Sequence, residues 1–366
     1  MTSPSWVTLP GCHRRRARTT RQKRERTCGL LASVSVTFAI GALGERGVRA
    51  GVAELPLTVA ICSNRPEMLA TGREALLAAL AARDRLVVVL DTVGSPAVER
   101  LVHALEASGA DVIVNGHNAG LAHSRNVAMA AVPTRHLVFI DDDVIIDQLV
   151  LDRVRDELAN GADVVGVRIV GSFPTRRLPW FVTDGQLHYL AVHSAARPVS
   201  VWGACMAFDV EMARRHGFTF DAGLGRRGRG LQSGDDSTFV RRLVAAGGRV
   251  ATVDDAHVLH QIGGDRLRLG YLLRRAFWQG RSEVRRRDAR AGLRKEWRRL
   301  ADRSVPPQKR LVLAPMFLTA VAAGVLWEIG TAGVLPEAPA PAHPRTTAGG
   351  PADRQPAVQP GAQPWT

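Results

Sequence analysis

The stretch Leu137-Val138-Phe139-Ile140-Asp141-Asp142-Asp143 places a short apolar run directly before three consecutive carboxylates. The apolar residues predict a buried strand. Three acids at the end of such a strand hold like charges close together, so they need a counter-charge. A divalent cation is the natural one, because Mg²⁺ is usually held by one or two carboxylates together with substrate phosphates. The alternative is a solvated aspartate turn that caps the next helix.

Strand-like and helix-like segments alternate in the residues around this stretch. Further strands are expected at residues 57–61, 86–90 and 111–114, and a helical pattern follows each of them. Ser95 and Pro96 suit the cap and the first position of one such helix. The order βαβαβαβ predicts an α/β fold with a mostly parallel central sheet and flanking helices, followed by a C-terminal helical extension. Ligands are expected at the carboxyl ends of the strands.

A second acidic centre lies at Gly234-Asp235-Asp236, just before a predicted helix. Two acids at a helix start often serve only to complement the helix dipole. Together with the triplet at residues 141–143, they become candidates for a general base that faces a metal-bound substrate. One acidic centre would then hold phosphates through the metal, and the other would accept a proton.

The chain has 366 residues and a formal net charge of +15, and this charge lies outside its middle part. Residues 1–27 carry eight Arg or Lys against one Glu, and residues 281–310 carry twelve against four acids. Residues 51–280 are balanced. A neutral middle flanked by basic, partly apolar segments favours an anionic membrane surface over nucleic acid as the partner.

These patterns divide the chain into five segments. They are a basic N-terminal extension (1–55), an α/β domain (56–262), a basic helical extension (263–310), an apolar membrane-associated segment (311–335) and a tail rich in Pro, Ala and Gly (336–366). The apolar run at 311–327 is short for a span and is followed by Glu328. It therefore either crosses the bilayer or lies in its interface.

An ordered set of motifs resembles the family 2 glycosyltransferases, which have the GT-A fold. Each motif is weak alone, but the order is specific and covers roughly residues 57–280. The set comprises Val59 to Pro66, Asp91, Asn118-Ala119-Gly120-Leu121-Ala122-His123-Ser124-Arg125-Asn126, Phe139-Ile140-Asp141-Asp142-Asp143, Trp202-Gly203-Ala204-Cys205-Met206-Ala207-Phe208, Gly234-Asp235-Asp236 and His260. The resemblance implies a GT-A type nucleotide-diphospho-sugar transferase fold for residues 56–262.

The resemblance also implies which residues bind the nucleotide sugar. They are Ser63, Asn64, Arg65, Asp91, Arg125, Asn126, Asp141, Asp142, Trp202 and Gly203. The loop after the first strand and Asp91 would hold the base and the ribose. Arg125 and Asn126 would approach the ribose and the diphosphate, and Trp202 and Gly203 would lie where the donor sugar meets the acceptor.

A metal site and a catalytic base are implied in the same way. The implied ligands of a Mg²⁺ or Mn²⁺ ion are Asp143, Asp141 and His260, with Asp143 favoured for direct contact. The alternative for His260 is a histidine satisfied in the core. Asp236, preceded by Asp235, takes the place of the family's base.

The implied chemistry is inverting transfer, in which an acceptor hydroxyl attacks the anomeric carbon while the nucleoside diphosphate leaves from the opposite face. Asp236 would remove the proton from that hydroxyl. The chain departs from processive members because it carries no Q-x-x-R-W element after His260, so one sugar per encounter is expected. Thr92-Val93-Gly94-Ser95 after Asp91 leaves the choice of nucleotide base open.

The donor's origin limits the topology. Sugar nucleotides are made in the cytosol, and the basic segment before residue 311 favours placing the catalytic domain at the cytoplasmic face of the cell membrane. The acceptor is unknown, with a lipid carrier or a cell-envelope glycan favoured.

Two other interpretations compete with this one. A nucleotidyltransferase of related α/β fold would normally have a glycine-rich loop of the form G-x-x-x-x-G-K-[ST], which this sequence lacks. A catalytically inactive scaffold that binds a membrane or nucleic acid would not need acids at both centres.

Overall fold

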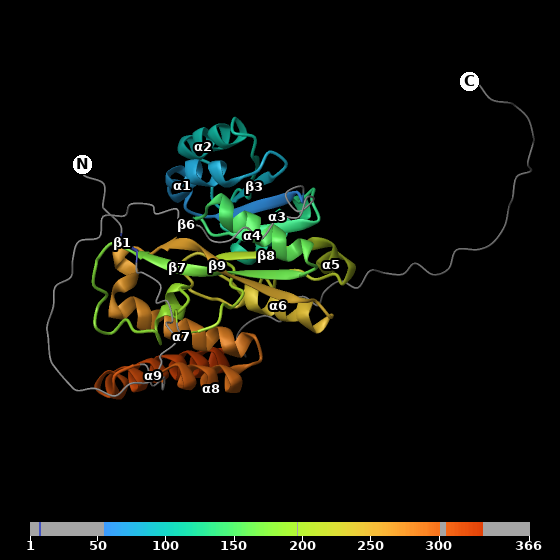
Figure 1. The fold of residues 1–366 in the computed structure, drawn as a ribbon. Helices are drawn as coiled ribbons and strands as arrows, with labels where there is room; N and C mark the ends of the chain where they lie inside the picture. Colours follow the sequence, from blue (N-terminus) through green and yellow to red (C-terminus); the bar gives the residue numbers. More distant parts are fainter. Residues whose placement is uncertain (1–6, 9–54, 196, 301–304, 332–366) are drawn as a thin grey trace, which may run out of the picture.

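The computed structural model describes residues 7–8, 55–195, 197–300 and 305–331. Most of the predicted N-terminal extension and all of the predicted Pro/Ala/Gly-rich tail lie outside the described residues. In the described part, one sheet runs in the order β4-β3-β2-β5-β8-β7-β9-β6, with helices on both of its faces (Figure 1). The short strand β1 (Val7–Thr8) pairs with β7.

The first half of the sheet is parallel, as the alternating pattern predicts. It consists of β4 (Asp111–Val114), β3 (Arg85–Leu90), β2 (Leu57–Ser63) and β5 (His136–Ile140). These strands pair only in parallel with one another. Side chains of β2, β3 and β5 are buried along almost their whole length, because helices cover both faces.

The second half of the sheet is mixed. β8 (Cys205–Asp209) is antiparallel to β5 and to β7 (Val164–Phe173), and β9 (Val250–Gln261) is parallel to β7. β6 (Val144–Ile145) is antiparallel to β9. The sheet is therefore less parallel than predicted, because the segment between β7 and β8 contains only a short 3₁₀ helix (Leu187–Leu190) and makes no helical crossover.

Helices α1 to α4 connect the first strands. They are α1 (Pro66–Ala79), α2 (Pro96–Glu106), α3 (Leu121–Ala131) and α4 (Gln148–Ala159). In α2 the hydroxyl of Ser95 accepts a hydrogen bond from Val98 N at 3.3 Å, and Leu101 and Leu105 are buried with Val98. The cap and the apolar spacing predicted for this helix are thus both present.

Five helices follow later in the described chain. They are α5 (Val210–Arg215), α6 (Asp235–Ala245), α7 (Leu269–Arg285), α8 (Ala289–Leu300) and α9 (Pro307–Thr331). Figure 1 shows α7, α8 and α9 as a layer below the sheet. The boundaries predicted for the segments before and after residue 262 stay predictions.

Helices α7 and α9 cross at two glycines. A methyl group on Gly280 would overlap the carbonyl oxygen of Val321, and one on Gly324 would overlap that of Phe277. Close to this crossing, Glu328 is 2% exposed. The acid that follows the apolar run is therefore part of the contact between α7 and α9.

Candidate active site

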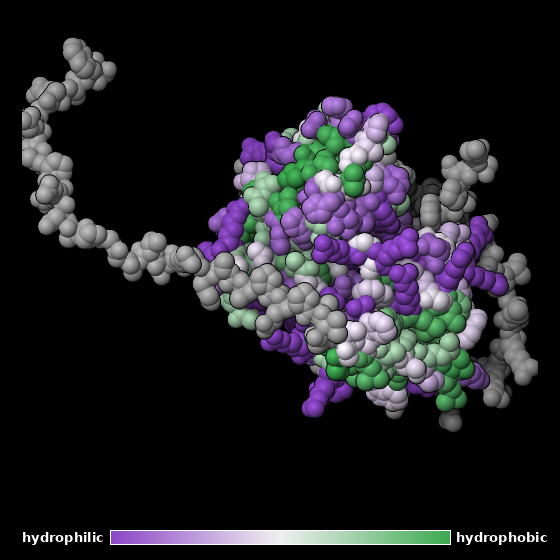
Figure 2. Space-filling view, turned by 180° about the vertical axis from the view of Figure 1, so that it is seen from behind, coloured by the Kyte–Doolittle hydropathy of each residue, from purple (hydrophilic) through white to green (hydrophobic). Residues whose placement is uncertain are grey.

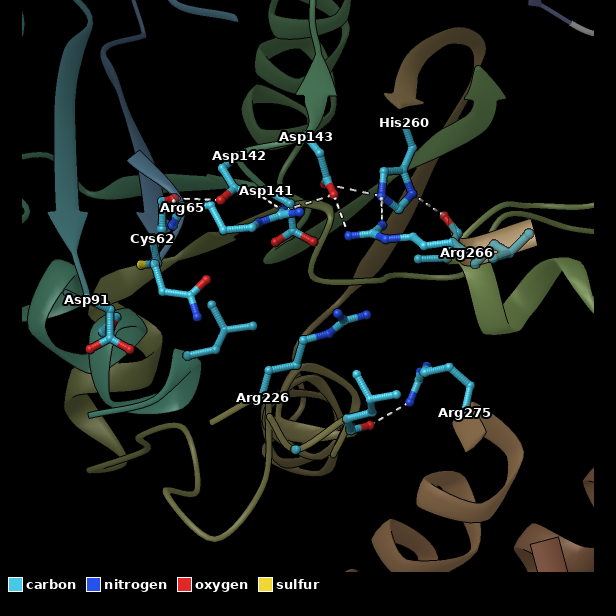
Figure 3. Close-up of a pocket in the computed structure, with 18 of the residues that line it drawn as sticks. Cys62, Arg65, Asp91, Asp141, Asp142, Asp143, Arg226, His260, Arg266 and Arg275 are labelled. Atoms are coloured by element: carbon cyan, nitrogen blue, oxygen red, sulfur yellow. Dashed lines mark hydrogen bonds and ion pairs between the residues drawn. The ribbon is translucent and has the colours of Figure 1, made fainter. Parts of the chain in front are cut away.

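The carboxyl ends of β2, β3 and β5 open into a cavity, which we name the first cavity (Figure 3). Its wall includes Ser63 at the end of β2, Asn64 and Arg65 after it, Asp91 after β3, and Asp141–Asp143 after β5. These residues are far apart in the sequence, but parallel strands place their carboxyl ends at the same edge of a sheet. The predicted convergence of polar strand ends is present in the structure.

Asp142 is held by the loop after β2. Ser63 Oγ donates to Asp142 Oδ2 at 2.5 Å, and Arg65 forms an ion pair with the other carboxylate oxygen. Burial raises the pKa of Asp142 and the neighbouring Asp143 raises it further, whereas Arg65 opposes both. The loop expected to hold a nucleotide base therefore also neutralises the acidic triplet.

Asp143 is 4% exposed and contacts His260 and two arginines. Its Oδ1 lies 3.1 Å from His260 Nε2, and its Oδ2 accepts from Arg266 at 2.9 Å and from Arg65 at 3.0 Å. Burial by itself would raise the pKa of Asp143, but His260, Arg266 and Arg65 together lower it well below its usual range. Asp143 is therefore an anion at neutral pH.

Strand pairing explains why Asp143 and His260 meet. Val144, the first residue of β6, is in register with His260 on β9, and Gln261 N donates to Asp143 O at 2.8 Å. Residues more than one hundred positions apart in the sequence thereby face each other across one antiparallel pair. A carboxylate oxygen and an imidazole nitrogen are brought together at the rim of the first cavity (Figure 3).

This donor set fits a divalent cation that shares its coordination with a substrate. Asp143 and His260 would supply one oxygen and one nitrogen ligand. In the described part of the chain, no group of three or more His, Cys, Asp and Glu side chains is placed to hold a metal without other ligands. Phosphate oxygens and water would complete the shell, as is usual for Mg²⁺.

Asp91 lines the first cavity, but its carboxylate is already bonded. Oδ1 accepts from Ala119 N and from Asn115 Nδ2, both at 2.8 Å, and Oδ2 accepts from Gly120 N at 2.9 Å. Gly120 has φ +104°, a conformation that favours glycine, and it precedes the first turn of α3. Asp91 thus fixes the loop that starts α3.

Arg125 joins the two acidic centres. It is 3% exposed, and it donates to Asp235 Oδ2 at 2.6 Å, to Asp141 Oδ1 at 3.3 Å and to Gly203 O at 3.0 Å. This placement differs from the expected contact with the ribose and diphosphate. The guanidinium points into the interior because two carboxylates there need its charge.

The two carboxyl groups that contact Arg125 have raised pKa values. Burial raises the pKa of Asp141 to about 6. Asp143 raises this pKa further by a smaller amount, whereas Arg125 lowers it. Burial likewise raises the pKa of Asp235, again opposed by Arg125. Asp235 is 4% exposed, so its carboxylate contacts Arg125 and is little exposed to substrate.

Asp236 lies in a second cavity, whose wall also includes Trp202, Gly203 and Gln279. Its Oδ2 accepts from Gly203 N at 2.8 Å and its Oδ1 from Ser237 N at 2.6 Å. A methyl group on Gly203 would overlap the guanidinium of Arg125. Gly203 therefore sets the direction of the Asp236 carboxylate and leaves room for the ion pair behind it.

Two further predicted residues lie in different surroundings. Trp202 stacks on His193 with ring centroids 4.1 Å apart and lines the second cavity. Asn126 lines neither cavity, because its amide group is bonded to the backbone of Phe220, which it contacts at 2.8 and 2.9 Å. Asn126 therefore links α3 to residue 220, and its predicted contact with the ribose stays a prediction.

The two cavities adjoin each other. Asp141, Ala191, Arg226 and Arg275 line both of them, so Asp143 in the first cavity and Asp236 in the second face a connected region. The three arginines Arg226, Arg266 and Arg275 were not identified from the sequence. Arg226 lies in a loop after β8, Arg266 in a 3₁₀ helix (Gly264–Leu267) and Arg275 in α7, where no residue spacing ties them to the acidic motifs.

Comparison with known proteins agrees with this arrangement. Residues 58–215 match the family described as Glycosyl transferase family 2. The Succinoglycan biosynthesis protein ExoM of Rhizobium meliloti (strain 1021) is 26% identical over 251 residues, which cover 66% of this chain and 79% of that protein.

Two solved structures are similar to this chain at low identity. The mannosyltransferase PcManGT from Pyrobaculum calidifontis, in complex with GDP-Man and Mn²⁺, is 19% identical with a TM-score of 0.47, and the match covers 77% of this chain and 76% of that one. The S. aureus TarS 1-349 in complex with UDP-GlcNAc is 12% identical with a TM-score of 0.44, covering 76% of this chain and 92% of that one.

The fold, the site and the matched domain define this protein as a glycosyltransferase of mixed α/β, GT-A type. Residues 58–215 form a glycosyltransferase family 2 domain. The predictions of family, fold class and enzyme class are thereby confirmed. Asp235, Asp236 and His260 lie after residue 215, outside the matched domain.

Proposed function

We propose that this glycosyltransferase moves one sugar from a nucleotide-diphosphate sugar to an acceptor hydroxyl with inversion at the anomeric carbon. The observation that carries the proposal is the pair of adjoining cavities. Asp143, held among cations, lines the first cavity, and Asp236, held by backbone N–H groups, lines the second. Donor and acceptor would meet at the residues common to both.

The first cavity is the proposed donor site. Ser63 and Asn64 lie at the strand end where the α/β fold places nucleotides, beside the loop that Asp91 fixes. Asp143 and His260 would hold a Mg²⁺ or Mn²⁺ ion, which would neutralise the diphosphate when bound. Arg65 and Arg266 already contact Asp143 and lie close enough to share the charge of the same diphosphate.

Asp236 is the proposed general base. Two backbone N–H groups fix its carboxylate at the wall of the second cavity. The acceptor oxygen would form its bond to the anomeric carbon while the bond to the diphosphate breaks, and the hydroxyl proton would pass to Asp236. Asp235 would act as a positioning residue, because its carboxylate holds Arg125.

The helices α8 and α9 form the proposed contact with an anionic membrane. Of the described helices, α9 alone is long and apolar enough to cross a bilayer. Its inner face packs on α7 from Leu313 to Glu328, over roughly 24 Å. A helix fixed along this length to a folded domain suits the membrane interface better than a crossing.

The outer side of this pair of helices has the composition that membrane binding requires. Leu326 and Trp327 on α9 and Trp297 on α8 are more than half exposed. Figure 2 shows apolar side chains gathered at the lower part of the molecule, where Figure 1 places α9. Arg294 and Arg298 on α8 are exposed and would attract anionic headgroups. A membrane position favours a lipid carrier or a cell-envelope glycan as the acceptor.

The activity is tested with a panel of nucleotide sugars. Thermal stabilisation in the presence of Mn²⁺ or Mg²⁺ first selects the donor, because a ligand that binds the folded state raises its stability. Nucleoside diphosphate release is then measured with and without EDTA, and the anomeric configuration of the product is read by NMR. We expect metal-dependent release and an inverted product. A retained configuration, or equal release in EDTA, contradicts the proposal.

The membrane contact is tested separately by co-sedimentation with vesicles. We expect binding to vesicles that contain an anionic lipid, weakened by salt and by Trp327→Glu. Leu149→Glu is the matched control, because Leu149 is similarly exposed, at 50% against 56%, and lies on α4, which packs against α1, β7 and β9. Equal loss of binding in both variants, or equal binding to neutral vesicles, contradicts the proposed contact.

A further inference from the structure

Three arginine side chains are buried among the described residues, and one differs from the others. Arg125 and Arg155 each form ion pairs with two aspartates. Arg275 is 7% exposed, and its hydrogen bonds go to two backbone carbonyls, Leu231 O at 2.6 Å and Tyr189 O at 3.4 Å. Within the described chain it has no carboxylate partner.

A buried cation without a counter-charge is unfavourable. Burial lowers the pKa of Arg275 to about 10, and the nearby Arg226 contributes in the same direction. The guanidinium nevertheless remains protonated at neutral pH. The positive charge of Arg275 is therefore present at the cavity wall, where an anionic ligand would supply the missing partner.

Arg226 is the second cation at the same place. Its backbone is fixed, because Leu121 N donates to Arg226 O at 2.8 Å, but its side chain has no ion pair among the described residues. Figure 3 shows Arg226 and Arg275 on the side of the first cavity opposite the acids Asp141, Asp142 and Asp143. Both arginines also line the second cavity.

We propose that Arg226 and Arg275 form a binding site for a phosphoryl group at the junction of the two cavities. Guanidinium groups match the geometry of phosphate oxygens, and a phosphoryl group has enough acceptors for two of them. This inference rests on the proposed function for the source of the group. That source is either the diphosphate of the donor or a phosphate carried by the acceptor. Both arginines lie beyond residue 215, outside the matched family domain.

The site is tested without metal and without turnover. Pyrophosphate is titrated into the full chain in the presence of EDTA, and binding is measured by calorimetry. We expect the wild-type chain to bind, and Arg226→Gln and Arg275→Gln each to weaken binding about tenfold, as expected when one charge-assisted contact is lost. Arg226 is exposed, so Arg226→Gln tests the site even if replacement of the buried Arg275 disturbs folding.

Arg227→Gln and Arg274→Gln are the matched controls. Each is an exposed neighbour of one member of the pair and lines neither cavity, so we expect pyrophosphate binding to be unchanged. Absence of binding by the wild-type chain, or equal binding by wild type and Arg226→Gln, overturns the site.

Competition distinguishes the two sources. A nucleoside diphosphate that displaces pyrophosphate assigns the site to the donor, and simultaneous binding of both assigns it to a phosphate on the acceptor. Failure of the proposed function would appear differently, as wild-type protein that binds pyrophosphate through these arginines but releases no nucleoside diphosphate from any sugar nucleotide.

Discussion

The two acidic centres of this glycosyltransferase are built in opposite ways. Asp143 at the first centre is almost fully buried and contacts two arginines and a histidine. Asp236 at the second centre is partly exposed and is held by two backbone N–H groups. The first arrangement suits a carboxylate that stays charged and binds cations, and the second suits a carboxylate that must accept a proton from a substrate.

The neighbouring acids show the same division. At the first centre, Asp142 shares Arg65 with Asp143, whereas at the second centre Asp235 is paired with Arg125 and Asp236 has no arginine partner among the described residues. Arg125 connects the centres through Asp141 and Asp235. Its position means that loss of Arg125 should disturb both centres.

The largest expected effect is on turnover, and it comes from a substitution at the second centre. Asp236→Asn keeps the size of the side chain but removes the base, so we expect turnover to fall by about 10²–10⁴-fold. Donor affinity should stay within about twofold of wild type, because Asp236 lines the second cavity only. Steady-state kinetics and donor titration measure the two quantities, and wild-type turnover would remove Asp236 from the mechanism.

Removal of the connection between the centres should destabilise the fold. Arg125→Met leaves Asp235 and Asp141 without their cation in a buried region, so we expect a loss of about 3–5 kcal/mol in the free energy of unfolding by urea. The double variant Arg125→Met/Asp235→Asn removes one uncompensated charge and should recover part of that loss. An unchanged midpoint in the single variant would show that Arg125 is not the link.

A smaller effect is expected from one methyl group between the centres. Gly203→Ala crowds the Arg125 guanidinium and shifts the N–H group that holds Asp236, so we expect kcat to fall about tenfold or more. Gly94→Ala is the matched control, since a methyl group there has open space and Gly94 lies on no cavity wall. Similar kcat values for the two variants would argue against this role of Gly203.

The smallest expected effect is on the pH dependence of the free energy of unfolding. The pKa of Asp141 is raised to about 6, so the folded chain binds more protons than the unfolded chain between about pH 4 and 6. The contribution of Asp141 to stability is present below its unfolded pKa and is lost as the pH rises through about 6. The difference in unfolding free energy between wild type and Asp141→Asn should therefore shift in favour of wild type from pH 7 to pH 5, as followed by urea denaturation.

The features that could be predicted from the sequence are those set by residues close together in the chain. The strands before Asp91 and Asp141 and the cap at Ser95 follow from short patterns, and the structure has all three. The ion pairs of Arg125 could not be predicted in this way, because Asp235 lies 110 residues away and no periodicity relates them. Arg275 was missed for the same reason.

The C-terminal region shows a related limit. In the sequence, the basic residues after position 280 read as one surface that faces the membrane. In the structure, Arg281 and Arg285 contact Glu328 at 2.7 and 2.5 Å, so part of that charge fixes α9 to α7. Only tertiary packing distinguishes the arginines that hold the helix from those that remain exposed on α8.

Donor binding by calorimetry, with and without Mn²⁺, tests the division between the two acidic centres most directly. We predict that Mn²⁺ strengthens donor binding to wild type and to Asp236→Asn, and that Asp143→Asn abolishes this gain. If Asp143→Asn bound the donor with the full Mn²⁺ dependence of wild type, the first centre would not hold the cation and the account of this site would be wrong.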